Sequence, residues 1–344
     1  MTGIKNKYLL IWFLSLAVVL GPAYTLFDNY TYNFQENPDL ETYIGLASFD
    51  FDQSPVRRYR VLVPFAAAGT NFILSPILDR VQPWTFPGPD FSLGFSFLLV
   101  NSALIALCGL LLFRLCRHFD ISITGAILGT LSFLTCRWTA YAAGLPIVDS
   151  LYLLVIMLVF LAIRARQDSL IILAILIGPW AKESFIFIAP LVFFFYPMRK
   201  GKLFLWFVVS GVIIFCFRYA FDALNGFPVS ESIQKDIGHF DQVGNSLERL
   251  FSFHGLYEIL SIIGLWGISL LLLIKKEFRH ALGTMTPSYF YFFLGIVLVH
   301  ALLSYDLARM FYLATPVLAV WYGKLADALL NGTGIPKFRI GQRY

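Results

Sequence analysis

The sequence predicts an all-α protein that crosses a membrane many times, and three observations support this fold class. Of its 344 residues, 58% are hydrophobic and only 14% are charged, whereas about a quarter of the residues of a soluble domain are charged. The apolar residues form long runs, many of them near the 20 or so residues that a spanning helix needs. Lys and Arg cluster between these runs, as topology signals do. This placement argues against nucleic-acid binding, which the net charge of +5 could suggest.

The apolar runs divide the chain into about ten transmembrane segments, some of them short for a span. The first run follows two lysines, as in a signal peptide, but it continues without a small-residue cleavage site, so we expect a retained helix. The expected helices, in chain order, cover residues 8–27, 61–78, 91–115, 121–140, 149–165, 169–180, 184–197, 203–220, 256–274, 289–305 and 307–326.

The basic connectors predict the orientation in the membrane. They are residues 114–118, 164–166, 198–202, 275–280 and 337–343. All of them lie in the cytoplasm if the N-terminus is cytoplasmic and residues 61–78 do not cross. If that segment crossed, the first connector and each later one would move outside. We therefore expect cytoplasmic N- and C-termini, with the ambiguous segment as a juxtamembrane or re-entrant helix on the outer side.

This orientation gives one transmembrane module, residues 1–344, without a soluble domain. Residues 28–90 form a large first outer loop that carries juxtamembrane helices. Residues 221–255 form a second outer loop, long enough to cap a cavity. The four cysteines lie in or beside apolar runs without a CxxC pair, so we expect buried thiols rather than a metal site or a disulfide framework.

The stretch NPDLETY, residues 37–43, opens the helical part of the first outer loop. Its Asn-Pro pair is typical of a helix start. On that helix Asp39 and Tyr43 share one face, while Glu41 points about 160° away from Asp39. A carboxylate here can act as general base towards an acceptor hydroxyl. The alternative is that both acids stabilise the helix N-terminus.

The stretch FDFDQ, residues 49–53, contains a D-x-D pair. Oxygen ligands at this spacing suit Mg²⁺ or Mn²⁺ bound with a diphosphate. D-x-D is a weak pattern, and a solvated turn is the favoured explanation, because turns are rich in Asp. We expect no metal or other cofactor and keep Asp50 and Asp52 as the weak candidates for a metal site.

The stretch PVRRYR, residues 55–60, places three arginines just before an apolar helix. Arginine binds phosphate oxygens in a planar, often bidentate manner, so Arg58 and Arg60 are candidates for contact with a lipid phosphate. The alternative is snorkelling at the end of the helix. The positive-inside bias weakens this alternative, because it disfavours arginines on the outer side.

Two further pairs of charged residues lie in or beside apolar runs. The motif WAKES places Lys182 and Glu183 between two short apolar segments, where charges are costly and often functional. Asp306 and Arg309 are three residues apart at the start of the last helix. This spacing suits an ion pair, and Arg309 could instead face a lipid-phosphate site.

Four other polar residues receive simpler interpretations. His239, in the second outer loop, is the best single histidine for an acid–base or phosphate role, although a loop histidine is more often just solvated. Arg137, Tyr141 and Asp149 lie near the outer ends of other helices, and we expect them to be interfacial anchors.

The order of these motifs resembles the GT-C superfamily of bacterial integral membrane glycosyltransferases. The residues that carry the resemblance are the D-x-x-x-Y of Asp39 and Tyr43, R-Y-R-V-L-V-P at 58–64, the K-E pair at 182–183 and the D-x-x-R at 306–309. The resemblance implies an all-helical membrane fold with a large first outer loop. It also implies transfer of a sugar from a polyprenyl-phosphate carrier to an acceptor on the outer face.

The resemblance also implies roles for individual residues. An acid of the first outer loop acts as base, which falls on Asp39 and then on Glu41. The candidates for binding the substrate or its lipid phosphate are Tyr43, Arg58, Arg60, Lys182, Glu183, Arg309 and His239. Family members that use lipid-monophosphate donors typically need no metal. The soluble C-terminal domain of larger relatives is not expected here, so the membrane module or a partner would recognise the acceptor.

Two other function classes remain open. A transporter or flippase for a lipid-linked or polyanionic substrate would need charges near the bilayer midplane, and such proteins are often built from internal repeats. We find no convincing repeat. A non-catalytic membrane subunit would bind a partner through the outer loops. The enzyme hypothesis predicts a bacterial inner-membrane location, with a polyprenyl-phosphate-linked sugar, membrane lipid and a glycan, lipid or protein acceptor as partners.

Overall fold

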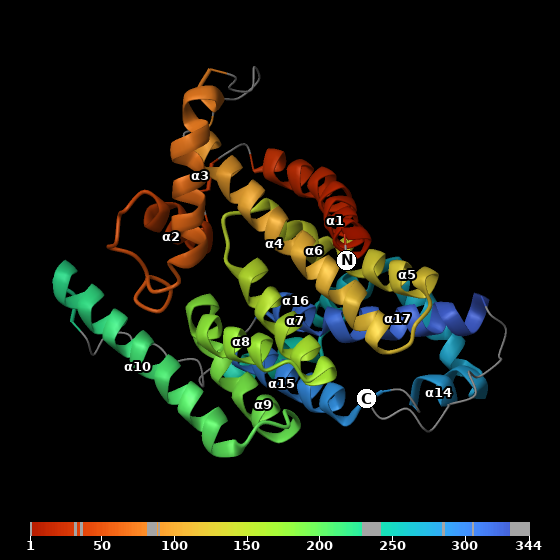
Figure 1. Ribbon diagram of the computed structural model, residues 1–344. Coiled ribbons are helices and arrows are strands. Elements are labelled where there is room, and N and C mark those ends of the chain that lie inside the picture. Colours follow the sequence, from red (N-terminus) through yellow and green to blue (C-terminus); the bar gives the residue numbers. More distant parts are fainter. Residues whose placement is uncertain are drawn as a thin grey trace.

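The computed structural model describes residues 2–30, 33–34, 37–80, 88, 90–228, 242–283, 286–304 and 306–330, and no β-strand occurs among them. The chain is a bundle of helices (Figure 1). In order they are α1 (Thr2–Asn29), α2 (Pro38–Ala47), α3 (Leu62–Leu78), α4 (Phe91–His118), α5 (Ile123–Leu134), α6 (Arg137–Gly144), α7 (Asp149–Ala165), α8 (Asp168–Ala181), η1 (Glu183–Ile188), α9 (Ala189–Phe195), α10 (Lys200–Asn225), α12 (Val243–Leu250), α13 (Phe253–Ile263), η3 (Gly264–Ile274), α14 (Lys276–Gly283), α15 (Ser288–Ser304), α16 (Leu307–Phe311), η4 (Tyr312–Ala314) and α17 (Thr315–Leu330).

The helices are those of a multi-pass membrane protein, but they do not confirm about ten spans. Within the described residues, four helices are long and apolar enough to cross a membrane, or up to six if each bent helix pair counts as one span. Several others are short: α5 has 12 residues, α8 has 14 and α9 has 7. The all-α class is confirmed, whereas the number of crossings stays a prediction.

The predicted segments largely coincide with observed helices, and the differences are breaks inside them. The segment expected at 121–140 is divided into α5 and α6 and continues to Gly144. The segments expected at 184–197 and 256–274 each combine a 3-10 helix with an α-helix. Apolar composition predicts a buried or lipid-facing segment, but it does not reveal where local partners interrupt the helix.

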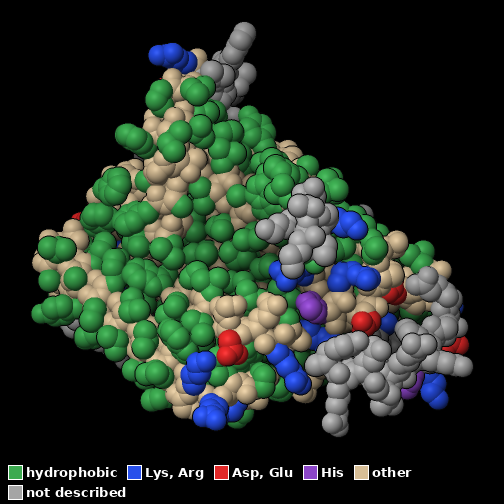
Figure 2. Space-filling model, in the orientation of Figure 1, with side chains coloured by type: hydrophobic (Ala, Val, Ile, Leu, Met, Phe, Trp, Pro, Cys, Tyr) green, Lys and Arg blue, Asp and Glu red, His purple; other side chains and the backbone are tan. Residues whose placement is uncertain are grey.

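Three of the connectors expected in the cytoplasm lie close together in the described part of the chain. Arg164, at the end of α7, donates to the carbonyl of His118 at 2.9 Å. Tyr196 donates to Asp168 at 2.6 Å, and Lys202 lies 3.6 Å from the same carboxylate. These contacts join three connectors that the charge pattern places on one side. In Figure 2 a broad hydrophobic surface covers this face of the molecule, and Lys and Arg gather mainly along its lower margin.

Helix α3, the ambiguous segment, lies against the first part of α4. Near its middle, Asn71 accepts a hydrogen bond from Ser92 at 2.7 Å, at the start of α4. This helix therefore does not run along the whole length of its neighbour, in keeping with the prediction that it stays on one side. Its outward face is strongly apolar, with Phe72 84% exposed and Ile73 72% exposed.

Helix α7 forms the centre of the core. Every residue from Asp149 to Ile163 is buried, and Figure 1 shows this helix between α1 and α10, which lie on opposite sides of the bundle. In contrast, α10 exposes large apolar side chains such as Phe204 and Phe215. An apolar face directed away from the protein is what lipid contact requires. Because α7 is buried from its first residue, Asp149 has a fixed position inside the protein.

Candidate functional site

Helix α2 places Asp39 and Tyr43 on its inner face. It begins at Pro38, as predicted, and the side chain of Asn37 accepts a hydrogen bond from the Asp39 N–H at 3.0 Å. Tyr43 is completely buried, whereas Glu41 is exposed. The helical spacing thus separates the two acids as expected, and only Asp39 points towards the rest of the site.

The chain turns sharply after α2 and returns two arginines to that helix. Phe49 adopts a left-handed conformation (φ 62°), and the next N–H donates back to the Gly45 carbonyl at 2.9 Å, which ends the helix. The returning segment pairs Arg57 with Asp39. Arg60 donates to the Tyr43 hydroxyl at 2.9 Å. Since the two arginines are three residues apart, both can face the same side of the turn.

A break between α6 and α7 carries Asp149 into the interior. The two helices meet at 118°, and the break frees backbone carbonyls that need partners inside a membrane protein. The side-chain amide of Asn101, on α4, donates to the carbonyls of Leu145 (2.9 Å) and Ile147 (3.0 Å). Ser150 donates to the Asn101 side-chain oxygen. This arrangement fixes the start of α7, where Asp149 lies.

A second break, between α8 and η1, directs Lys182 and Glu183 inward. Lys182 has an extended backbone (φ −164°, ψ 137°) and its ammonium lies 3.5 Å from Asp149. Glu183 accepts hydrogen bonds from the Nε and Nη2 of Arg60 at 2.9 and 2.6 Å, and from Arg218 of α10 at 3.2 Å. Lys182 and Glu183 are adjacent in the sequence, but they belong to different ion pairs. The sequence predicted only that charged residues interrupt the apolar segment here.

Arg309 connects the two halves of the site. Its Nε and Nη2 donate to one oxygen of Asp149 at 3.0 and 2.5 Å, and its Nη1 donates to Asp39. Asp306 does not form the expected side-chain ion pair with Arg309. It accepts from the Arg309 backbone N–H at 3.2 Å and so caps α16. The guanidinium is thereby left to pair with acids from two distant helices.

Most of these charged side chains line a cavity of about 610 Å³, a volume in the usual range for small-molecule sites. Tyr43, Asp149 and Arg218 contact its lining residues but are not part of the wall. Its wall combines polar and apolar side chains. The polar side chains are Asp39, Ser54, Arg57, Arg60, Lys182, Glu183, Ser184, His300, Ser304, Asp306 and Arg309, and the apolar ones are Val56, Ile186, Phe187, Leu303 and Met310. The cavity could accept a ligand with an anionic head and an apolar tail.

The charges around the cavity keep Asp39 ionised. Burial would raise the pKa of this carboxyl, but Arg309 and Arg57 outweigh it and hold the pKa below its ordinary value. Burial likewise opposes the charge of Arg60, yet Glu183 and Tyr43 raise its pKa above the ordinary value. At neutral pH the site therefore presents a carboxylate beside permanently charged guanidinium groups.

Some predicted site residues lie elsewhere. Arg58 was expected to contact phosphate, but it is 1% exposed and outside the cavity wall. It lies 3.1 Å from Asp222 and 4.2 Å from the Phe227 ring centroid. Because it neighbours Arg57 directly, its side chain leaves the turn on the other side. Glu41 also lies outside the cavity wall.

The metal candidates Asp50 and Asp52 do not line the cavity. Asp50 and Asp52 are exposed, and Asp50 accepts hydrogen bonds from the Asp52 N–H and the Gln53 side chain, which is turn geometry. His239 lies outside the described residues. Among the described residues, no group of three His, Cys, Asp or Glu side chains could hold a metal ion.

The structure adds site residues that the sequence did not single out. Arg57 was grouped with its neighbours but not chosen, and Asp149 was interpreted as an interfacial anchor. His300 also lines the cavity and lies 3.3 Å from the Tyr152 hydroxyl. The sequence offered one signal for Asp149, which is an acid directly before a long apolar run. Nothing local indicated that it would pair with Arg309, 160 residues later.

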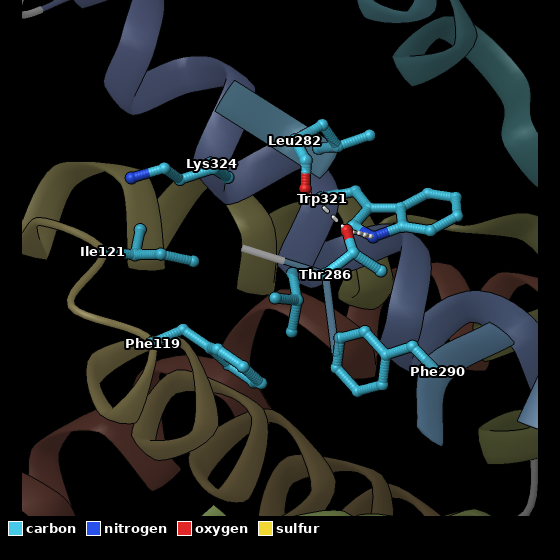
Figure 3. Close-up of a pocket in the computed structure, with 8 residues that line it drawn as sticks. Phe119, Ile121, Leu282, Thr286, Phe290, Trp321 and Lys324 are labelled. Atoms are coloured by element: carbon cyan, nitrogen blue, oxygen red, sulfur yellow. Dashed lines mark hydrogen bonds between the residues drawn. The ribbon is translucent and has the colours of Figure 1, made fainter. Parts of the chain in front are cut away.

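A second hollow, at the other end of the bundle, is too small to bind a ligand. It measures about 10 Å³, which is at most the room for one water molecule. Figure 3 shows it between Phe119, Phe290 and Trp321, where the Trp321 indole donates to Thr286 at 3.1 Å. We therefore assign the functional site to the large charged cavity.

No family model, curated protein or solved structure matched the chain in the three comparisons.

Proposed function

We propose that this protein is a membrane glycosyltransferase that moves a sugar from a polyprenyl-phosphate carrier to an acceptor on the outer face. One observation carries the proposal: a single cavity combines the Asp39 carboxylate, several fixed cations and an apolar wall. A lipid-linked sugar has an anionic phosphate and a long apolar tail, and the acceptor needs a base. The cavity offers a partner for each of these parts.

The chemistry follows from the geometry. The acceptor hydroxyl attacks the anomeric carbon, and its proton passes to the Asp39 carboxylate. The bond between that carbon and the phosphate oxygen breaks, and its electron pair leaves with the polyprenyl phosphate. Arg57, Arg60, Lys182 and Arg309 line the same cavity and can stabilise the charge on the leaving phosphate. The step needs no redox partner, because one bond to the anomeric carbon replaces another.

The apolar wall suits the carrier lipid. Ile186 and Phe187 of η1 line the cavity together with Leu303 of α15 and Met310 of α16. Ile186 is 66% exposed, so this wall continues to the outer apolar surface. An isoprenoid chain could therefore leave the cavity into the lipid without crossing a charged surface.

A transfer assay with matched acid variants tests the proposal. Purified protein is offered polyprenyl-phosphate hexose or pentose with a membrane-fraction acceptor, and labelled product is measured. We expect Asp39→Asn to lose at least about 100-fold in rate, as removal of a general base typically does. Glu41→Gln, on the exposed face of the same helix, should retain transfer. Undiminished transfer by Asp39→Asn would reject the assigned base and favour a non-catalytic subunit.

A flippase or transporter is the second candidate, and the helix breaks beside the cavity favour it. Transporters often bind charged substrates where helices are interrupted, and both Asp149 and Lys182 lie at such breaks. In proteoliposomes, a flippase would move an intact fluorescent lipid-phosphate sugar between leaflets without acceptor. The transferase should instead consume the donor only when the acceptor is present.

A further inference from the structure

We propose that Arg57 and Arg309 form one anion-binding site that Asp39 fills as an internal counterion, and that an anionic ligand displaces this carboxylate. This inference deepens the proposed function. It rests on that proposal for one point, that the ligand is a phosphodiester. It adds a step before transfer, in which binding of the donor releases the base. Asp39, Arg57 and Arg309 share one set of ion-pair contacts, which an anion could also make.

Asp39 bridges the two arginines with separate oxygens. Its Oδ1 pairs with Nη2 of Arg57, and its Oδ2 accepts from Nη1 of Arg309. A phosphate also presents several oxygens that can each accept from a different guanidinium. The carboxylate thus makes contacts of the kind that a phosphodiester would make, and both compete for the same N–H groups.

The two arginines are anchored differently. Arg309 stays in place without Asp39, because Asp149 holds its Nε and Nη2. Asp149 is 3% exposed and is also paired with Lys182, so this anchor is rigid. For Arg57, the described part of the chain provides one ion pair, that with Asp39, and its side chain is 32% exposed. It can therefore follow an incoming anion into the cavity.

The cavity wall holds two other acids. Asp306 accepts from the Arg309 backbone N–H rather than from a guanidinium, and Glu183 is held more firmly than Asp39. Glu183 receives three hydrogen bonds, two of them from the same side of Arg60. Arg60 itself is 8% exposed and also donates to Tyr43. If a ligand replaced Glu183, more hydrogen bonds would break, and at a more buried position, than if it replaced Asp39. Asp39 is therefore the carboxylate that an anion would displace first.

Displacement has a chemical consequence for the base. A carboxylate that accepts from two guanidinium groups is a poor proton acceptor, because its charge is already neutralised. When an anion takes over the two arginines, Asp39 loses both partners and gains a negative neighbour. Both changes make it a better proton acceptor. The base would thus become effective only when the donor phosphate is bound, which limits unproductive reactions.

Direct binding measurements test the inference without any transfer reaction. The probes are inorganic sulfate, which does not titrate near neutral pH, and the diester farnesyl methyl phosphate, both added to the full-length protein in detergent. Affinity is measured by calorimetry and by the shift in melting temperature. We expect Asp39→Asn to bind both probes about fivefold or more tightly than wild type, the low end of typical coupling between sites, because the arginines lose their competitor.

Arg57→Gln should weaken binding of both probes by a similar factor. The matched controls are Glu258→Gln and Arg249→Gln, which alter a partly exposed Arg–Glu pair on α12 and α13 outside the cavity wall. Both should bind like wild type. Misfolding cannot imitate the expected gain in Asp39→Asn. Equal or weaker binding by this variant would overturn the inference.

The same data separate this inference from the proposed function. If Asp39→Asn binds more tightly but the wild type transfers no sugar, the anion site stands and the transferase proposal fails. If transfer depends on Asp39 but the variant gains no affinity, the inference fails and the transferase proposal stands. Tighter binding of the diester than of sulfate assigns the site to a lipid phosphate, and equal binding assigns it to a free anion.

Discussion

At the scale of single residues, two adjacent arginines have opposite roles. Arg57 lines the cavity and remains partly exposed, whereas Arg58 is buried against Asp222 and Tyr59. Tyr59 also donates to Asp222, at 2.8 Å. Arg58 thus holds the C-terminal end of α10 against the segment that precedes α3. The sequence could not separate the two residues, because both are arginines in the same short turn.

The buried pair predicts that Arg58→Gln is mainly a stability defect. Removal of one partner leaves the Asp222 carboxylate buried without its charge partner, which typically costs about 3–5 kcal/mol. We expect a clear fall in the melting temperature in detergent, with anion affinity of the folded fraction unchanged. Arg57→Gln should give the reverse pattern. Unchanged stability of Arg58→Gln with weaker sulfate binding would return Arg58 to the phosphate role.

At the scale of elements, the site depends on interrupted helices. The break before α7 is held by Asn101, which satisfies two carbonyls that an unbroken helix would have satisfied internally. Asp149 reaches Arg309 only because α7 begins at this place. The break is therefore a requirement of the site.

Asn101→Leu should disrupt this break. The two side chains share the same branched shape, but leucine leaves two buried carbonyls unpaired, at about 1–3 kcal/mol each. We expect a lower melting temperature and, because Asp149 shifts, weaker binding of farnesyl methyl phosphate. The control is Asn71→Leu, which removes a half-buried amide whose recorded partner is the Ser92 hydroxyl. If Asn101→Leu is no worse than this control in both measurements, the break does not depend on the amide.

Glycines allow helices α5 and α17 to pack closely against each other. A Cβ on Gly129 would lie 2.4 Å from the Ala319 carbonyl oxygen, and one on Gly125 would lie 2.6 Å from that of Gly323. The spacing of four residues places both glycines on one face, as in small-residue contacts between membrane helices. The two backbones can approach only where no side chain intervenes.

Gly129→Ala should therefore force α5 and α17 apart and lower the melting temperature. Gly211→Ala is the matched control, since a Cβ on Gly211, in the middle of α10, meets nothing within 4 Å. Alanine is preferred over glycine inside helices by roughly 0.5–1 kcal/mol, so the control should be neutral or slightly more stable. Equal melting temperatures for the two variants would show that α5 and α17 tolerate separation.

At the scale of the whole molecule, the protein has two chemically different ends. One end holds the charged cavity, formed by residues from Asp39 to Arg309. At the other end, three of the basic connectors lie close together, as the contacts of Arg164 and Tyr196 show. Between them lies an apolar surface (Figure 2). This division agrees with the orientation that the positive-inside rule predicts, with the cavity facing outward.

Labelling of single cysteines tests this orientation. In a background with the exposed Cys216 replaced by alanine, Glu41→Cys marks the cavity end and Lys202→Cys marks the basic end. In spheroplasts of a bacterial host, a charged maleimide should label Glu41→Cys directly and Lys202→Cys only after permeabilisation. Labelling of both from outside would contradict the predicted orientation, and labelling in the reverse order would invert it.

The sequence by itself determined the all-α class, its apolar helices and the positions of most of them, and it predicted a helix start at the segment around Asp39. These features depend on hydropathy, helical spacing and capping residues, which are local properties of the chain. The separation of Asp39 from Glu41 follows from the helical period alone. The helix breaks within apolar segments could not be predicted, because their partners, such as Asn101, lie far away in the sequence.

Only the tertiary structure decided which charged residues meet. It selected Arg57 and Arg60 over Arg58 and moved Asp149 from the membrane interface into the site. Ion pairs between α2, α7 and α16 join residues up to 270 positions apart. A buried charge is stable only beside a partner of opposite sign, and long-range packing chooses that partner. For this reason the charge pattern predicted only which segments carry the charges, and the fold alone arranged them around one cavity.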